Sequence, residues 1–108
     1  MNNSSWIDAA DAAAVPEEDV IGLAVGGRDI ALYKVEGSIY ATDNICTHGL
    51  ARLCEGFLLG HEIECPRHQG RFDIRDGRGT CEPITIAVRC YPVRIEAGRV
   101  LLQFADSP

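Results

Sequence analysis

Two short motifs, each pairing a cysteine with a histidine, place the strongest constraint on how this chain can fold. One holds Cys46 and His48 and the other holds Cys65 and His68. Turn-forming residues flank both motifs, so each motif is expected to occupy its own loop. The fold must therefore bring together two loops that each offer one thiolate and one imidazole, which makes a complete ligand set for iron or zinc.

The spacing within each motif favours a cluster of two metal atoms over a single ion. Side chains at i and i+2 of an extended chain point to the same side, so Cys46 and His48 can reach neighbouring atoms of one centre. Pro66 fixes φ directly after Cys65 and suits a tight turn that directs Cys65 and His68 the same way. A two-iron centre with two thiolate and two imidazole ligands fits this pattern. A structural zinc site with the same four ligands is the alternative.

The residues around these ligands resemble the Rieske-type ferredoxins of bacterial aromatic-ring dioxygenase systems, in particular the naphthalene, salicylate and anthranilate dioxygenase ferredoxins. The resemblance covers nearly the whole chain. The matching stretches are Cys-Thr-His-Gly at 46–49, Cys-Pro-Arg-His-Gln-Gly-Arg-Phe-Asp at 65–73, Ala-Leu-Tyr at 31–33, Tyr-Ala-Thr-Asp-Asn at 40–44 and Tyr-Pro-Val at 91–93. Motifs of this length make the cluster a far better interpretation than zinc.

The resemblance implies one Rieske-type 2Fe-2S cluster per chain, bound by Cys46, His48, Cys65 and His68. Each iron of such a centre is saturated by two sulfides and two protein ligands, so the centre passes electrons and leaves no position for substrate. The implied function is therefore that of an electron carrier and not of an enzyme. The implied partners are an NADH-dependent flavoprotein ferredoxin reductase and the terminal ring-hydroxylating oxygenase.

Two other classes of function stay open at this point. One is a zinc-stabilised interaction module, which would be colourless where a ferredoxin is red-brown. The other is the small Rieske subunit of a nitrite-reductase-like oxidoreductase, which would be permanently bound to a large subunit. The aromatic substrate cannot be read from this chain, because the electron-carrying component never touches it.

Charge and composition limit the partners and the compartment. The chain carries 10 basic and 16 acidic residues, a formal net charge of −6, which argues against nucleic acid or an anionic membrane as partner. No stretch has the length of a signal peptide or of a membrane span. Three cysteines are left over from the ligand set, and we expect buried or half-buried thiols at Cys54, Cys81 and Cys90. We therefore expect a cytoplasmic monomer in a reducing compartment.

Short strands at regular intervals predict an all-β fold, and the chain length predicts one domain. We expect a Rieske-type antiparallel β-sandwich or barrel, residues 1–108, with a small inserted cluster-binding subdomain. The basal β part is expected at 1–44 and 76–108 and the cluster-binding part at 45–75.

Several local predictions can be checked against the structure. Residues 8–14 are rich in alanine and are expected to form a turn or two of helix before Pro16. The expected hairpins include one that turns at Gly26 and Gly27 and one that turns at Gly60 and His61. We interpret His61 as a surface residue and not as a ligand.

The glycines and the C-terminal segment carry further expectations. Glycines 49, 56 and 70 are expected to allow positive φ or close approach of the backbone. By resemblance, residues 82–84 form an apolar lid over the cluster or, alternatively, merely interrupt strand pairing. In the last hairpin, apolar residues are expected to face inward at alternating positions, from Val93 and Ile95 to Phe104.

The reduction potential can be predicted from two features of high-potential Rieske proteins that this sequence lacks. High-potential Rieske proteins have a disulfide between the ligand loops and a serine hydroxyl bonded to a cluster sulfur, and the corresponding positions here look like Ala51, Arg67 and Gly70. Fewer hydrogen bonds then stabilise the added electron. We expect a midpoint potential of about −150 mV, the low end of the Rieske range. A redox titration monitored by absorbance measures it, and a value above zero would contradict this reasoning.

Overall fold

The computed structural model describes residues 5–47, 49, 51–67, 70–81 and 86–104, without the side chains of residues 5 and 81. In this part of the chain, antiparallel strands form three sheets and helix is limited to two short 3-10 turns. This confirms the all-β prediction. None of the described helices has the length and apolar character needed to cross a membrane.

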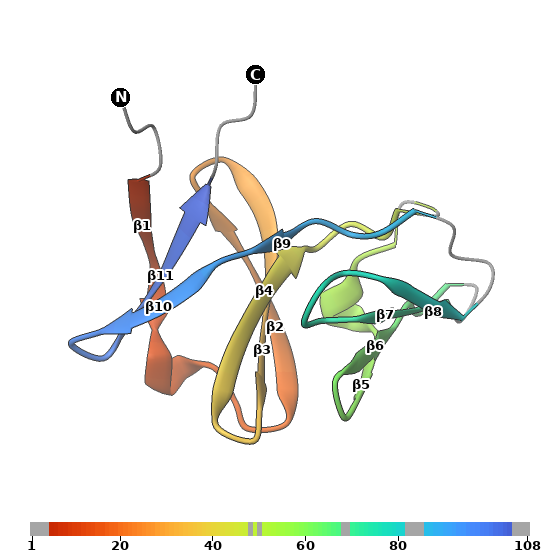
Figure 1. Cartoon of the computed structure of the whole chain (residues 1–108), viewed down its shortest axis with the longest axis horizontal. Helices are drawn as coiled ribbons and strands as arrows, with labels where there is room; N and C mark the ends of the chain where they lie inside the picture. Colours follow the sequence, from red (N-terminus) through yellow and green to blue (C-terminus); the bar gives the residue numbers. More distant parts are fainter. Residues whose placement is uncertain (1–4, 48, 50, 68–69, 82–85, 105–108) are drawn as a thin grey trace.

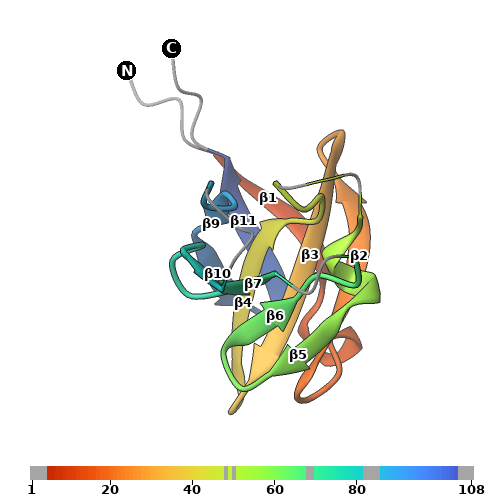
Figure 2. The ribbon, with the colours of Figure 1, turned by 90° about the vertical axis from the view of Figure 1, so that its right-hand side faces the viewer.

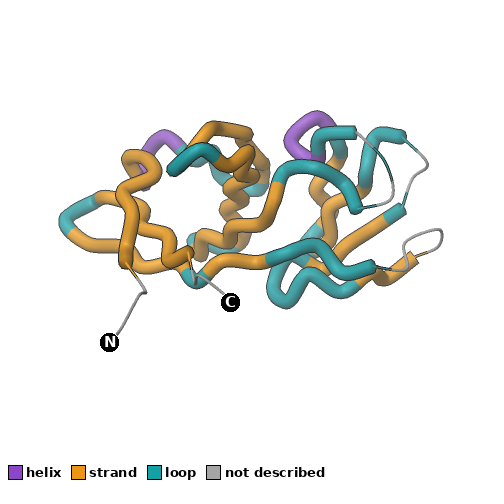
Figure 3. The backbone as a smooth tube through the Cα atoms, turned by 90° about the horizontal axis from the view of Figure 1, so that it is seen from above, coloured by secondary structure: helices purple, strands orange, loops and turns teal. Residues whose placement is uncertain are grey.

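Two sheets form one lobe and the third forms a smaller lobe beside it (Figures 1 and 3). The first sheet has the order β1-β11-β10, with bounds Ser5–Asp11, Arg99–Phe104 and Val93–Glu96. The second sheet has the order β2-β3-β4-β9, with bounds Asp19–Val25, Arg28–Val35, Ser38–Asp43 and Cys90–Tyr91. The small sheet has the order β5-β6-β7-β8, with bounds Phe57–Leu59, Glu62–Glu64, Arg71–Asp73 and Gly79–Cys81.

The central strand β3 is buried on both faces. Residues alternate between the two faces of a strand, and Ile30, Ala31, Leu32 and Tyr33 all have no exposed surface. Ile30 and Leu32 belong to the core between the first and second sheets, whereas Ala31 and Tyr33 belong to the core under the small sheet. One strand therefore supports both lobes, and Figure 2 shows the small sheet lying across the second sheet.

The predicted hairpins are confirmed. Gly26 and Gly27 have φ of 58° and 82°, the double left-handed turn that β2 and β3 need for a tight connection. The β5–β6 hairpin turns at Gly60 and His61, with Leu59 opposite Glu62. Phe72 is fully buried under the small sheet.

The helix predicted for residues 8–14 is wrong. Strand β1 continues to Asp11 because it pairs with β11, with a register shift between Asp8 and Ala10, and only Ala12–Ala14 form a 3-10 turn. Strand pairing gives the backbone groups partners that an isolated alanine-rich segment would find only within a helix. The intrinsic propensity is too weak to oppose this pairing.

One inward-facing residue was also predicted wrongly. Ile95 is 48% exposed, and Val93 is only half-buried, whereas Val100, Leu102 and Phe104 of the neighbouring strand are buried as expected. Strand β10 lies at the edge of its sheet. The alternation of apolar residues predicted the correct face of the strand, because Ile95 lies opposite the buried Val100. At the edge of the sheet, however, the side chain of Ile95 stays exposed to solvent.

A buried carboxylate fixes the turn between β7 and β8. Asp73 accepts hydrogen bonds from the backbone N–H of Arg75 at 2.9 Å and from its guanidinium at 2.8 and 3.0 Å, and Arg78 lies 3.6 Å away. The side chain of Asp73 is only 5% exposed. Hydrogen bonding to Arg75 is the main cause that lowers the pKa of Asp73 from 3.8 to about 2.

This shift predicts how stability depends on pH. Because the pKa of Asp73 is lower in the folded state, its stabilisation is complete above pH 4 and is lost as the pH falls toward 2. The D73N variant should lower the free energy of unfolding by about 2 kcal/mol at neutral pH. Its deficit should shrink between about pH 4 and pH 2. Urea unfolding across this pH range measures the difference, and a deficit independent of pH would contradict the assignment.

Candidate metal centre

The first ligand loop, residues 44–52, leaves strand β4 and returns beside its own start. Ile45 and Arg52 form an isolated antiparallel bridge at its base. Within the loop, the backbone N–H of Cys46 donates to the carbonyl of Ala51 at 2.9 Å, and that of Gly49 donates to the carbonyl of Cys46 at 3.3 Å. These bonds hold Cys46 inside the loop, where it is 3% exposed.

The second ligand loop, residues 65–70, connects β6 to β7. The backbone N–H of Cys65 donates to the carbonyl of Gly70 at 2.7 Å, which closes the loop where the two strands meet. Cys65 is 2% exposed, whereas Pro66 and Arg67 are exposed at the outside of the turn. The loop thus turns its thiol inward and its arginine outward.

The two cysteine side chains, one from each loop, belong to the same buried cluster under the small sheet. Burial is the main cause that raises the pKa of Cys65, and the neighbouring Cys46 raises it further. Two buried sulfur donors in one cluster of side chains fit a soft metal or an iron-sulfur cluster.

Of the four predicted ligands, the structure therefore brings together Cys46 and Cys65. His48 and His68 lie outside the described residues. Their neighbours Thr47 and Arg67 are both exposed. The assignment of the two histidines stays a prediction.

The third histidine belongs to a different part of the small lobe. His61 lies in the β5–β6 turn, with its ring edge-on to that of Tyr40 at a centroid distance of 5.7 Å. Its carbonyl accepts the backbone N–H of Ile74 at 2.8 Å. His61 is half-buried, with its ring against Tyr40, and that it is no ligand stays a prediction.

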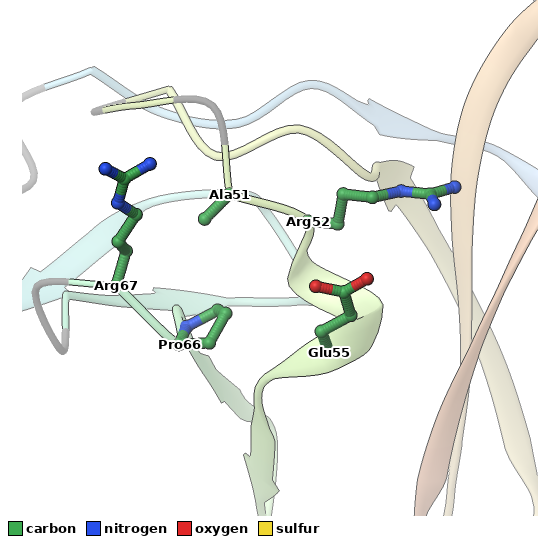
Figure 4. A pocket seen from close by; sticks show the side chains of 5 residues that line it. All are labelled: Ala51, Arg52, Glu55, Pro66 and Arg67. Atoms are coloured by element: carbon green, nitrogen blue, oxygen red, sulfur yellow. The ribbon is translucent and has the colours of Figure 1, made fainter.

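A hollow of about 410 Å³ separates the two ligand loops. Residues of both loops and of the following 3-10 turn, Leu53–Glu55, line it, namely Ala51, Arg52, Glu55, Pro66 and Arg67. Figure 4 shows that Arg67 rises beside the hollow, whereas Arg52 extends away from it toward the second sheet. Three of its five lining residues, Arg52, Glu55 and Arg67, carry a charge.

A third segment approaches the first ligand loop. The hydroxyl of Thr47 donates to the carbonyl of Ile86 at 2.6 Å, and Ile86 is itself 63% exposed. The proposed lid at 82–84 lies outside the described residues. Thr47 therefore ties the first ligand loop to the chain that follows that segment.

Sequence reasoning missed two residues that hold the first ligand loop. Asn44 is fully buried and donates to the carboxylate of Asp29 at 3.0 Å. The sequence showed Asn44 only as a turn residue, and no pattern links it to Asp29 on another strand. A buried amide becomes recognisable only when its partners are in place.

Comparison with known proteins decides the family. The model of the Rieske [2Fe-2S] domain matches residues 5–92. The chain belongs to the Rieske family. The two buried sulfur donors fit the cluster that gives this family its name, so the protein carries a Rieske-type 2Fe-2S cluster.

Relatives of this Rieske protein are ferredoxins of dioxygenase systems. It is 59% identical, over 92% of its length and 95% of the relative's, to the ferredoxin component of the naphthalene 1,2-dioxygenase/salicylate 5-hydroxylase systems of Ralstonia sp.. The ferredoxin of carbazole 1,9a-dioxygenase from Nocardioides aromaticivorans has a TM-score of 0.87 at 30% identity, covering 95% of this chain and 99% of that one.

A further solved structure is a complex of reduced oxygenase and oxidised ferredoxin in carbazole 1,9a-dioxygenase. It matches with a TM-score of 0.86 at 32% identity and covers 95% of this chain and 96% of that one. With these relatives, the Rieske protein is an electron-carrying ferredoxin and not a catalytic enzyme.

A glycine allows the chain after the 3-10 turn Leu53–Glu55 to approach the start of the second ligand loop. Gly56 has φ of −93°, so it is close approach and not positive φ that requires glycine. A Cβ on Gly56 would collide with the carbonyl oxygen of Glu64 and would lie 3.2 Å from Cδ of Pro66. The residues on either side of Cys65 therefore pack directly on this glycine.

The G56A variant should therefore lower the free energy of unfolding by about 2 kcal/mol, because the start of the second ligand loop must shift. Thermal unfolding of the purified protein measures the loss. The matched control is G60A at the other end of the same hairpin, where a Cβ meets no atom within 4 Å and only the positive φ of 60° is unfavourable. Equal losses in the two variants would contradict the role of close packing.

Proposed function

We propose that this ferredoxin carries one electron from an NADH-dependent flavoprotein reductase to the terminal oxygenase of an aromatic-ring dioxygenase system, as a cytoplasmic monomer. The supporting observation is the burial of two thiols, one from each ligand loop, in the same cluster of side chains, in a chain so similar to a dioxygenase ferredoxin. A bound 2Fe-2S cluster supplies a site that accepts and releases a single electron. The chain itself supplies binding and orientation.

In this proposal Cys46 and Cys65 hold one iron, and His48 and His68 hold the other. The burial of both thiols in one cluster supports the first half, because neighbouring sulfurs can share one metal atom. The ligand spacing supports the second half. Replacing two thiolates by neutral imidazoles removes negative charge and raises the potential above that of all-cysteine clusters.

We also propose a single domain over residues 1–108, with the cluster-binding part at 45–75 and the basal part at 1–44 and 76–108. The lobe formed by the small sheet supports this division. Strand β8 pairs with β7, so the small sheet itself continues past residue 75 to Cys81.

We propose that both redox partners dock at the end of the molecule that carries the ligand loops. Residues 46–80 hold five arginines and five acidic residues, so this region is less acidic than the rest of a chain with net charge −6. Arg67 is exposed beside the hollow between the loops. Electron transfer needs only a brief encounter, for which a small and partly charged interface is sufficient.

Ligand substitutions test the proposed centre. The purified protein should be red-brown and contain two irons and two acid-labile sulfides per chain. Serine at Cys46 or Cys65, or alanine at His48 or His68, should abolish the visible absorption. The control H61A should keep the absorption, because His61 lies in the distant β5–β6 turn. Unchanged absorption in the His68 variant would contradict the ligand set, and a colourless protein with bound zinc would support the interaction module.

Reconstitution tests the partners. The ferredoxin should support NADH-dependent hydroxylation of an aromatic substrate when it is mixed with a flavoprotein reductase and a terminal oxygenase of this class. The H61A protein should support the same rate, and the protein without its cluster should support none. Stable co-purification with a large reductase subunit would favour the nitrite-reductase-like alternative instead.

A further inference from the structure

One carboxylate oxygen accepts hydrogen bonds from the residues at both ends of the first ligand loop. Oδ1 of Asp29 accepts a hydrogen bond from Nδ2 of Asn44 at 3.0 Å and another from the guanidinium of Arg52 at 3.2 Å. Asn44 begins the loop and Arg52 ends it. Asp29 is the second residue of strand β3 and directly precedes the fully buried run from Ile30 to Tyr33, so the loop is attached to the strand that contributes to both cores.

The contacts of Asn44 fix the orientation of its amide. Its Oδ1 accepts the backbone N–H of Cys54 at 2.8 Å, so its NH2 group must face Asp29 and the sulfur of Cys54, at 3.0 and 3.2 Å. Its backbone N–H donates to the carbonyl of Asp29 at 2.9 Å, and its carbonyl accepts from Leu53 at 2.6 Å. Asn44 has no exposed surface, so each of these bonds is costly to lose.

The second contact, between Asp29 and Arg52, is more exposed. The side chains of Arg52 and Asp29 are 48% and 35% exposed, so their charges are partly screened by solvent. The pKa of Asp29 lies below its usual value, mainly because of the hydrogen bond from Asn44 and secondarily because of Arg52. The buried amide is therefore the stronger of the two attachments.

We propose that Asp29 is a positioning residue for the cluster, which acts by clamping both ends of the first ligand loop to strand β3 through Asn44 and Arg52. The inference rests on the proposed ligand roles of Cys46 and His48. The loop contains the buried Cys46, whose N–H is bonded within the loop to Ala51. A shift at the base of the loop therefore moves a sulfur ligand.

The consequence concerns how tightly and in what geometry the cluster is held. Residues that orient ligands without touching the metal commonly change metal affinity by about 10- to 100-fold when they are replaced. Asp29 and Asn44 would act in this way through the backbone of the loop. They would leave the identity of the four ligands unchanged.

The N44D variant tests the clamp with almost no change of shape. It keeps the acceptor for Cys54 but replaces the donor that faces Asp29, so two carboxylates meet. We expect cluster loss, followed as bleaching of the visible absorption in the presence of a chelator, to be about tenfold faster than in the wild type. We also expect shifted g-values in the electron paramagnetic resonance spectrum of the reduced protein.

The swapped double variant N44D/D29N provides the rescue. It places an amide at 29 and a carboxylate at 44, so the hydrogen bond between these two positions is restored in the opposite direction and the net charge is that of the wild type. The amide NH2 then takes the place of the oxygen that accepts from Arg52, so the attachment of Arg52 is lost. Cluster lifetime and g-values should therefore return part of the way to wild-type values. If N44D fails to fold, D29N and R52Q probe the same clamp from its other two members, each with a shorter cluster lifetime expected.

D8N is the control for charge alone. Asp8 forms an exposed ion pair with Arg99 at 2.8 Å on the first sheet, so the variant removes one negative charge and one arginine partner without touching the ligand loops. Its cluster lifetime and g-values should match those of the wild type. Wild-type lifetimes in N44D, D29N and R52Q alike, or a double variant no better than N44D, would overturn the clamp. A wild-type protein without iron would instead overturn the proposed function.

Discussion

The rest of the structure depends on strand β3, which is buried on both faces and contributes side chains to both cores. Leu32 contributes to the core between the two larger sheets, and its neighbour Tyr33 contributes to the core under the small sheet. A strand with apolar contacts on both sides can move only if both cores move. The cluster-binding lobe is thus built directly on the most constrained element of the basal lobe.

Polar contacts add precision to this apolar support. The phenol of Tyr33 and the hydroxyl of Thr42 are buried together at 2.8 Å, and burial raises the pKa of Tyr33. Asp29, at the start of the same strand, holds the first ligand loop through Asn44. Apolar burial fixes which elements meet, whereas directional bonds of this kind fix the positions of loops that carry few apolar side chains. An electron carrier needs this precision, since its ligands must keep one geometry through repeated reduction and oxidation.

The second ligand loop is supported in a different way. Close packing at Gly56 and the bond that closes the loop at Gly70 hold Cys65, and the salt bridge of Arg71 with Glu64, at 3.3 Å, spans the strands on either side. The two loops therefore have separate supports, and both place a cysteine in the same buried cluster. This shared cluster brings together two motifs that are distant in sequence.

The sequence by itself determined the elements that depend on local chemistry. Gly26 and Gly27 specified a tight hairpin, and the two cysteine-histidine motifs predicted two metal-binding loops, because turn conformation and ligand type are properties of a few adjacent residues. Only the tertiary structure decided that residues up to Asp11 form a strand, that Ile95 is exposed and that Asn44 bonds to Asp29. Each of these depends on a partner from elsewhere in the chain, or on the lack of one, and the energy of pairing or burial outweighs the local preference that the sequence expresses.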